Sequence, residues 1–263
     1  MQTAINQRLD RFLEGHPTDA QKIVPMTPIE NVYPGRAAVV SDTDATGKTG
    51  RMPLFNQLDL SMSASFISTD VFSGTLKVYE LDGTLLTTAA ISQTYSANSH
   101  ALMIEGIRAK LDAIPNSTAV TTDTSNNRAI RLTLANNQFM EIITAFSATG
   151  GAAPTVTATK GSTDVLAGIW AYANVGNIDG DVTYFANKAK APVLVQGDIP
   201  VHVKDTDIEY GETPRAIIEA DGDHARGTWT NDGDANPSIS LGSSKFATDD
   251  QTNELALISV NLP

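Results

Sequence analysis

The chain contains no cysteine, which excludes disulfide bonds, thiolate catalysis and cysteine-ligated metal sites. It has no run of about 18 apolar residues, the length that a membrane-spanning helix needs. No apolar block follows Arg8 and Arg11, so we expect no secretory signal at the N-terminus. At 263 residues the chain is long enough to bury a substantial core in one large or two modest domains.

Basic residues are scarce, with 18 Lys and Arg against 30 Asp and Glu and a formal net charge of −12. The excess is concentrated in residues 161–263, which carry 6 basic and 16 acidic side chains. An acidic surface repels phosphate backbones, so no direct nucleic-acid binding is expected. The charge is typical either of simple solubility or of a surface that faces a basic partner.

The first 35 residues have little apolar surface to bury against themselves. Ile5, Leu9, Phe12 and Leu13 fall on one face at helical spacing. Four prolines follow between residues 16 and 34, and proline favours extended chain over helix. We therefore predict an N-terminal arm, a short amphipathic helix followed by extended chain, that grips a neighbouring molecule and is dispensable for folding. The alternative is that the apolar stripe packs on the chain's own body. The arm residues expected to contact a partner are Ile5, Leu9, Phe12, Leu13, Val24, Ile29, Val32 and Tyr33.

Changes of pattern predict a mainly β protein in three parts: the arm over 1–35, an all-β body formed by 36–75 and 161–263, and a small α+β domain inserted over 76–160. The body is expected to be a sandwich or barrel, because short apolar or alternating runs follow one another between turns. Asp42–Gly50 is predicted to be a turn-rich loop. The predicted body strands are Arg36–Ser41, Ser65–Thr69, Val165–Tyr172, Val193–Val195, Ile199–Val203, Arg215–Glu219, Gly227–Thr230 and Leu255–Leu262.

The inserted domain contains the clearest helix signal of the chain. Met103, Ile107, Leu111 and Ile114 repeat at helical spacing and a proline follows, which predicts a helix over Ser99–Ile114. An Asp-Gly pair between the first two strands of this domain indicates a hairpin. The predicted strands are Leu76–Glu80, Leu85–Ile91, Arg128–Leu134, Phe139–Thr144 and Thr155–Thr159.

Three Asp-Gly-Asp triplets lie in the acidic region, at 179–181, 221–223 and 232–234. Paired carboxylates on a tight turn can bind calcium, but a calcium site needs about six to eight oxygens and no triplet matches the EF-hand loop. Asp-Gly is also among the commonest hairpin turns. The triplets fit both interpretations, and ordinary turns are favoured.

No motif nominates a catalytic or metal-binding group. The histidines His16, His100, His202 and His224 lack the spacing of metal ligands. No Gly-x-Ser-x-Gly sequence marks a nucleophilic serine. We therefore predict no catalytic, cofactor-binding or metal-binding residues and no cofactor.

Four segments of the body follow one another in a recognisable order. Val32–Asp42 reads VYPGRAAVVSD and Leu166–Val175 reads LAGIWAYANV. Pro192–Pro214 reads PVLVQGDIPVHVKDTDIEYGETP, and Gly227–Pro263 ends in the strand LALISVNL before its final proline. In this order and spacing the segments resemble the structural cement proteins of tailed bacteriophages. Relative to the compact members of that family, the block from about 75 to 160 is an insertion.

This resemblance implies a capsid cement, or decoration, protein rather than an enzyme. Such a protein binds the outer surface of the major capsid shell and stabilises the mature head. The implied partners are the major capsid protein and neighbouring copies of the chain in a dimer or trimer, with no nucleic acid and no membrane. The implied location is the virion surface, after synthesis in the host cytoplasm.

Two other functions are compatible with the residues. The first is a calcium- or carbohydrate-binding β module of a virion or cell-surface protein, with the acidic triplets and the inserted domain forming its site. The second is a hydrolase on a β scaffold, which would require an acid/base set that the sequence does not display.

Overall fold

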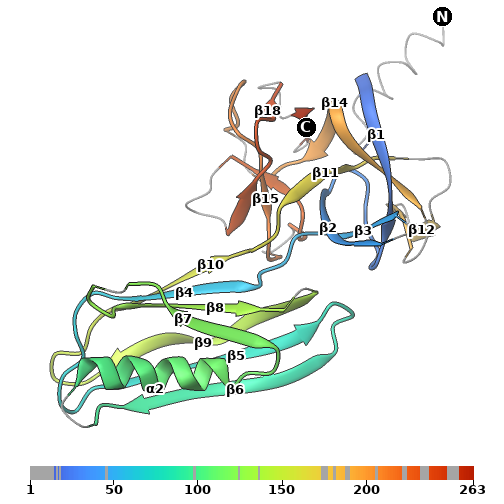
Figure 1. The fold of residues 1–263 in the computed structure, drawn as a ribbon. Helices are drawn as coiled ribbons and strands as arrows, with labels where there is room; N and C mark the ends of the chain where they lie inside the picture. Colours follow the sequence, from blue (N-terminus) through green and yellow to red (C-terminus); the bar gives the residue numbers. More distant parts are fainter. Residues whose placement is uncertain are drawn as a thin grey trace, which may run out of the picture. The chain divides into compact units, whose positions relative to one another are not determined.

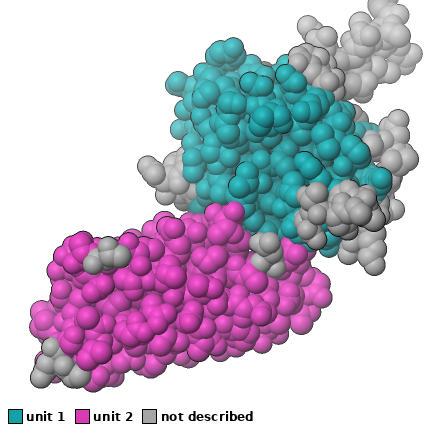
Figure 2. Space-filling view, viewed as in Figure 1, with its two compact units in different colours: residues 1–54, 164–263 teal, residues 55–163 magenta. Residues whose placement is uncertain are grey.

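The computed structural model describes the chain except for residues 1–14, 16, 18, 45–46, 97–98, 124, 136, 173–176, 180–181, 187–189, 205–206, 221–223, 232–236 and 248–254. The protein is mainly β, which confirms the predicted fold class. It consists of two compact units, residues 1–54 with 164–263 (unit 1) and residues 55–163 (unit 2), coloured separately in Figure 2.

Unit 1 is built on a closed barrel of five strands in the order β1-β3-β2-β11-β14, in which β1 also pairs with β14 (Figure 1). β1 runs parallel to β3, and the other neighbours are antiparallel. The sheet continues from β14 to β19 and β18. The barrel strands are β1 (Asp19–Pro28), β2 (Ala37–Asp44), β3 (Gly47–Arg51), β11 (Leu166–Trp170) and β14 (Ala191–His202). The other strands of unit 1 are β12 (Asn177–Asp179), β13 (Val182–Tyr184), β15 (Arg215–Ile217), β16 (Trp229–Thr230), β17 (Ser238–Ser240), β18 (Lys245–Phe246) and β19 (Leu255–Asn261).

The prediction of an arm is wrong for residues 19–28, because these residues form β1, a strand of the chain's own barrel. Val24 of β1 lies opposite Val193 of β14, and Thr27 pairs with Thr49 of β3. Val32, which follows β1, is fully buried and forms a bridge with Phe185. An extended free arm is therefore the wrong interpretation of this segment. The proline-rich sequence favours extended chain, and extended chain is also the conformation of a strand.

Two apolar clusters form the core of unit 1. The first fills the barrel, because Gly50 of β3 lies against Met26 of β1 and Trp170 of β11, a strand that is not its neighbour. The second joins β14 and β19 to the sheet β16-β15-β17 and includes Trp229. The indole Nε1 of Trp229 donates a 2.7 Å hydrogen bond to the carbonyl of Gly35. Both tryptophans of the chain are thus buried in unit 1.

Unit 2 consists of two antiparallel sheets, β10-β4-β8-β7 and β6-β5-β9, and one helix, α2. Buried side chains alternate along β4, β5 and β8, as expected for strands with one face toward a core. The bounds are β4 (Gln57–Met62), β5 (Val71–Glu80), β6 (Leu85–Thr94), α2 (His100–Asp112), β7 (Ser117–Thr121), β8 (Ala129–Leu134), β9 (Gln138–Thr149) and β10 (Val156–Gly161). The helix lies where periodicity predicts it, with Ser99 as its N-cap and its predicted apolar stripe buried.

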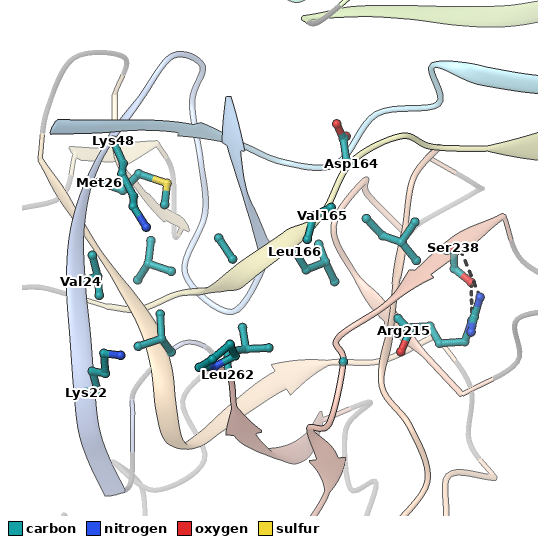
Figure 3. Close-up of a pocket in the computed structure, with 17 residues that line it drawn as sticks. Lys22, Val24, Met26, Lys48, Asp164, Val165, Leu166, Arg215, Ser238 and Leu262 are labelled. Atoms are coloured by element: carbon teal, nitrogen blue, oxygen red, sulfur yellow. Dashed lines mark hydrogen bonds between the residues drawn. The ribbon is translucent and has the colours of Figure 1, made fainter. Parts of the chain in front are cut away.

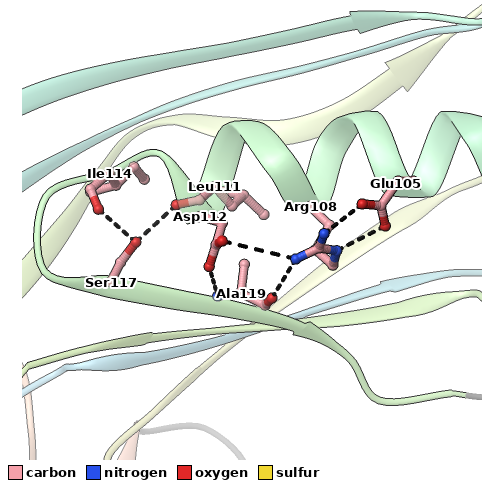
Figure 4. A network of polar contacts seen from close by, with 7 residues as sticks. All are labelled: Glu105, Arg108, Leu111, Asp112, Ile114, Ser117 and Ala119. Carbon is pink, nitrogen blue, oxygen red and sulfur yellow. Dashed lines mark hydrogen bonds and ion pairs between the residues drawn. The ribbon is translucent and has the colours of Figure 1, made fainter.

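Polar contacts attach the end of α2 to β7 (Figure 4). The Arg108 guanidinium donates to the Glu105 carboxylate and, at 3.2 Å, to the carbonyl of Ala119. The Asp112 carboxylate accepts a 2.9 Å hydrogen bond from the amide of Ala119. The Ser117 hydroxyl donates to the carbonyl of Leu111 in the last helical turn and to that of Ile114 just beyond the helix. The bond to Leu111 satisfies a carbonyl that the helix end leaves unpaired, and the contacts with Ala119 satisfy backbone groups of β7.

Two local predictions differ from the structure. The segment predicted as a strand over 65–69 is a loop, in which Thr69 has a positive φ of 79° and Phe66 stacks on His100. The segment predicted as a loop over 42–50 contains the end of β2 and most of β3. The insertion also begins earlier than predicted, because β4 pairs with β8 and β10 and so places residues 55–75 in unit 2.

Candidate functional site

A pocket of about 800 Å³ opens on unit 1 beside the barrel (Figure 3). Its wall is mainly apolar and includes Val24 and Met26 of β1 and Val193 and Val195 of β14. These side chains pack in the cluster that fills the barrel, so the pocket leads into the barrel core. Val165, at 79% exposed, also lines the pocket. A concave site of this size with apolar walls is suited to receive an apolar group.

The charged groups of the pocket are mostly cationic. Lys22, Lys48 and Arg215 line it, and Figure 3 shows the ammonium groups of both lysines on the side formed by β1 and β3. Arg215 donates to the hydroxyl and carbonyl oxygens of Ser238. Both lysines are exposed, and within the described part of the chain no carboxylate pairs with them. The pocket therefore favours an apolar group that carries negative charge.

The carboxylate at the edge of the pocket, Asp164, is already engaged. Its two oxygens accept 2.7 Å hydrogen bonds from the Arg51 guanidinium. It also accepts a 2.8 Å bond from the amide of Leu54. The side chains of Arg51 and Asp164 are 1% and 4% exposed, so this is a buried, bidentate ion pair. It joins the two points at which the chain leaves and re-enters unit 1.

A second, partly buried pair, Glu30 with Arg226, lies close enough to Arg51 and Asp164 to interact with them electrostatically. Burial raises the pKa of the Glu30 carboxyl, while the charge of Arg226 and a 2.7 Å hydrogen bond from the amide of Met52 oppose the rise. Burial likewise lowers the pKa of Arg226, against the attraction of Glu30. For both groups the cost of removing the charge from water exceeds the gain from the partner.

The raised pKa of Glu30 predicts a pH dependence of stability. Between 4.5, the ordinary value, and the higher folded-state pKa, the folded protein keeps a proton that the unfolded chain has released. The contribution of Glu30 is therefore fully present below the unfolded-state pKa and is lost as the pH rises through the folded-state pKa. We expect the free energy of unfolding of the wild type, relative to Glu30→Gln, to fall with rising pH.

Urea unfolding followed by tryptophan fluorescence over about pH 4–7 measures this difference, since Glu side chains titrate in that range. Glu105→Gln, followed by circular dichroism, is the control with the opposite sign. A hydrogen bond from Arg108 lowers the pKa of Glu105, so the stability of the wild type relative to this variant is expected to rise with pH. A difference between wild type and Glu30→Gln that grows with pH would contradict the assignment.

The predicted site residues separate into two groups. Ile5, Leu9, Phe12 and Leu13 lie outside the described residues, so their contact with a partner stays a prediction. Val24 lines the pocket and Val32 is fully buried, whereas Ile29 and Tyr33 are half-buried. Of these later arm residues, Val24 alone lies in the pocket, and Val32 has no surface to offer a partner.

The acidic triplets at 221–223 and 232–234 also lie outside the described residues, as does most of 179–181. Elsewhere in the described chain no group of three or more His, Asp or Glu side chains is arranged to hold a metal ion. His100 is part of the fold, because its Nδ1 accepts from the amide of Phe66 at 3.1 Å and its Nε2 lies 2.9 Å from the Asn127 carbonyl.

Sequence reasoning did not identify Lys22, Lys48 or Arg215. These residues come from three strands and meet through the closure of the barrel and the packing of β15 beside it. One local signal was present, since Lys22, Val24 and Met26 alternate as residues on one face of a strand do.

Comparisons with known proteins show no family. No protein-family model and no curated protein matches the chain. Among solved structures, a chain from "The capsid of Myoviridae Phage XM1" matches with a TM-score of 0.32 and 20% sequence identity. The match covers 38% of this chain and 63% of that chain, which is less than two thirds of its length. No helix in the described residues is long and apolar enough to cross a membrane.

Proposed function

We propose that the chain is a structural protein of a phage virion, a cement protein that binds the outer surface of the major capsid shell and stabilises the mature head. One observation carries this proposal. The four segments that resemble the cement proteins cover most or all of β2, β11, β14 and β19, which are four successive neighbours in one sheet. Segments far apart in sequence therefore form one continuous structure, as a shared barrel requires.

Along the sequence, unit 2 falls between the first and second of these segments, and it contains none of them. Its two sheets and helix have a core of their own, including Leu58, Leu76 and Ile107. This is the organisation of a domain inserted into a barrel, and it supports the barrel as the part that attaches to the shell.

Such a protein needs a rigid body and contacts with the shell that can each be weak. A shell presents many identical sites, so weak contacts made at several points together give strong attachment. A closed barrel loses little conformational freedom on binding, which reduces the cost of each contact. The function needs no catalytic group, and we propose a structural rather than an enzymatic role.

Co-sedimentation tests the proposal. The purified protein is mixed with expanded capsids of the source phage, with immature shells, and with no particles, and the pellets are assayed. We expect saturable pelleting with expanded capsids, much weaker pelleting with immature shells, and none without particles. Equal pelleting with both shells, no pelleting with expanded capsids, or turnover of a substrate would overturn it.

A further inference from the structure

An exposed aromatic side chain stands among carboxylates on the loop that precedes β15. Tyr210 is 76% exposed, and its neighbours Asp207 and Glu209 are exposed as well. Tyrosine is enriched at the centres of protein interfaces, where its ring is buried and its hydroxyl finds a partner. Within one described chain nothing covers this ring, and Tyr210 does not line the pocket of its own chain.

The loop is held rigidly in this projecting form. Gly211 adopts a positive φ of 87°, and its amide donates a 2.9 Å hydrogen bond to the carbonyl of Phe246. The amide of Phe246, a buried residue of β18, donates in turn to the carbonyl of Glu212 at 2.9 Å. The Glu212 carboxylate accepts from the amide of Glu209 and from the Asn231 side chain. A projection fixed before binding costs little entropy when it docks.

The pocket and the loop are complementary in charge and in polarity. The pocket offers apolar side chains and the ammonium groups of Lys22 and Lys48, which no carboxylate among the described residues pairs with. The loop offers an aromatic ring beside the carboxylates of Asp207 and Glu209. The positive charge of the pocket therefore matches the negative charge of the loop, and the apolar wall of the pocket matches the aromatic ring.

We propose that the Tyr210 loop of one copy occupies the pocket of a second copy. The ring of Tyr210 packs on the apolar wall that contains Val24, and the carboxylates of Asp207 and Glu209 face Lys22 and Lys48. A reciprocal exchange of loops gives a closed two-fold dimer, and a one-way contact is head-to-tail and closes into a ring when the rotation permits. This self-association does not depend on a capsid shell, so it can be tested separately from attachment.

Sedimentation velocity over a range of protein concentrations gives the first test. We expect the wild type to form a defined oligomer, and Tyr210→Ser and Lys22→Glu/Lys48→Glu each to weaken association at least tenfold. Ile143→Ser is the matched control, because Ile143 is an exposed apolar residue of unit 2. Circular dichroism verifies that each variant is folded. Restored association when Asp207→Lys/Glu209→Lys is added to the double lysine variant would establish the charge pairing.

Cross-linking gives a second test, which is clean because the chain has no cysteine. Tyr210→Cys and Lys22→Cys are made as single variants, mixed and oxidised. We expect a disulfide-linked dimer in the mixture at far higher yield than in either variant alone. A wild type that stays monomeric at all concentrations, association unchanged in Tyr210→Ser, or cross-linking no stronger in the mixture would overturn the proposal.

Discussion

Replacing Asp164 by alanine is expected to lower the free energy of unfolding of unit 1 by about 3–5 kcal/mol, the cost of leaving a buried charge without its partner. The Arg51 guanidinium is 1% exposed and donates two 2.7 Å hydrogen bonds to this carboxylate. Nη1 of Arg51 also donates to the carbonyl of Met52 at 3.1 Å, a weaker acceptor than a carboxylate. The amide of Leu54 loses its acceptor as well.

Tryptophan fluorescence during urea unfolding measures this effect in unit 1 specifically, because both tryptophans of the chain lie there. Asp59→Ala, followed by circular dichroism, is the matched control. Asp59 accepts two hydrogen bonds from Arg131 at 2.7 and 2.9 Å, but the two side chains are 35% and 43% exposed. We expect that exposed pair to contribute less than about 1 kcal/mol.

A double variant separates the cost of an unpaired charge from the value of the pair. Arg51→Met/Asp164→Val removes both charges and leaves apolar side chains, so it is expected to recover much of the loss. A loss below about 1 kcal/mol in Asp164→Ala would show that solvent or another group reaches Arg51. A double variant as unstable as the single one would show that the pair itself, rather than the unpaired charge, determines stability.

The elements that the sequence predicts well are those whose signals are local. The stripe of Met103, Ile107 and Leu111 indicated α2, and the Asp-Gly pair indicated the hairpin of β5 and β6, where Gly83 has a φ of 84°. In both cases neighbours in sequence are neighbours in space. Local periodicity and turn chemistry therefore sufficed.

β3 and the pocket could not be predicted in this way. β3 reads GKTGR and has no apolar pattern, because its order comes from pairing with β2 on one side and β1 on the other. Lys22, Lys48 and Arg215 surround the pocket through the same long-range pairings and the packing of β15. A chain segment that is stabilised by distant partners leaves little mark on its own sequence.

Deletion of residues 1–30 is expected to prevent folding of the barrel, the reverse of what a dispensable arm predicts. Without β1, β14 loses its partner over residues 191–198, β3 loses a neighbour, and the ring no longer closes. The deletion also removes Met26, whose side chain is only 3% exposed. Burial of such a side chain contributes about 1.5–3 kcal/mol to the free energy of unfolding. The lost strand pairing adds to this cost, and the stability of a whole domain is typically only about 5–15 kcal/mol.

Deletion of residues 1–12 is the control that distinguishes a dispensable arm from a strand that the barrel requires. It retains β1 and also Gly15, whose amide donates to the carbonyl of Pro200 and whose carbonyl accepts from the amide of Tyr172. We expect this shorter deletion to keep the emission spectrum of buried tryptophan and a cooperative unfolding transition, and the longer one to lose both. Circular dichroism of the longer deletion should still report a folded unit 2, whose strands pair among themselves. Native tryptophan emission after removal of residues 1–30 would mean that the barrel closes without β1.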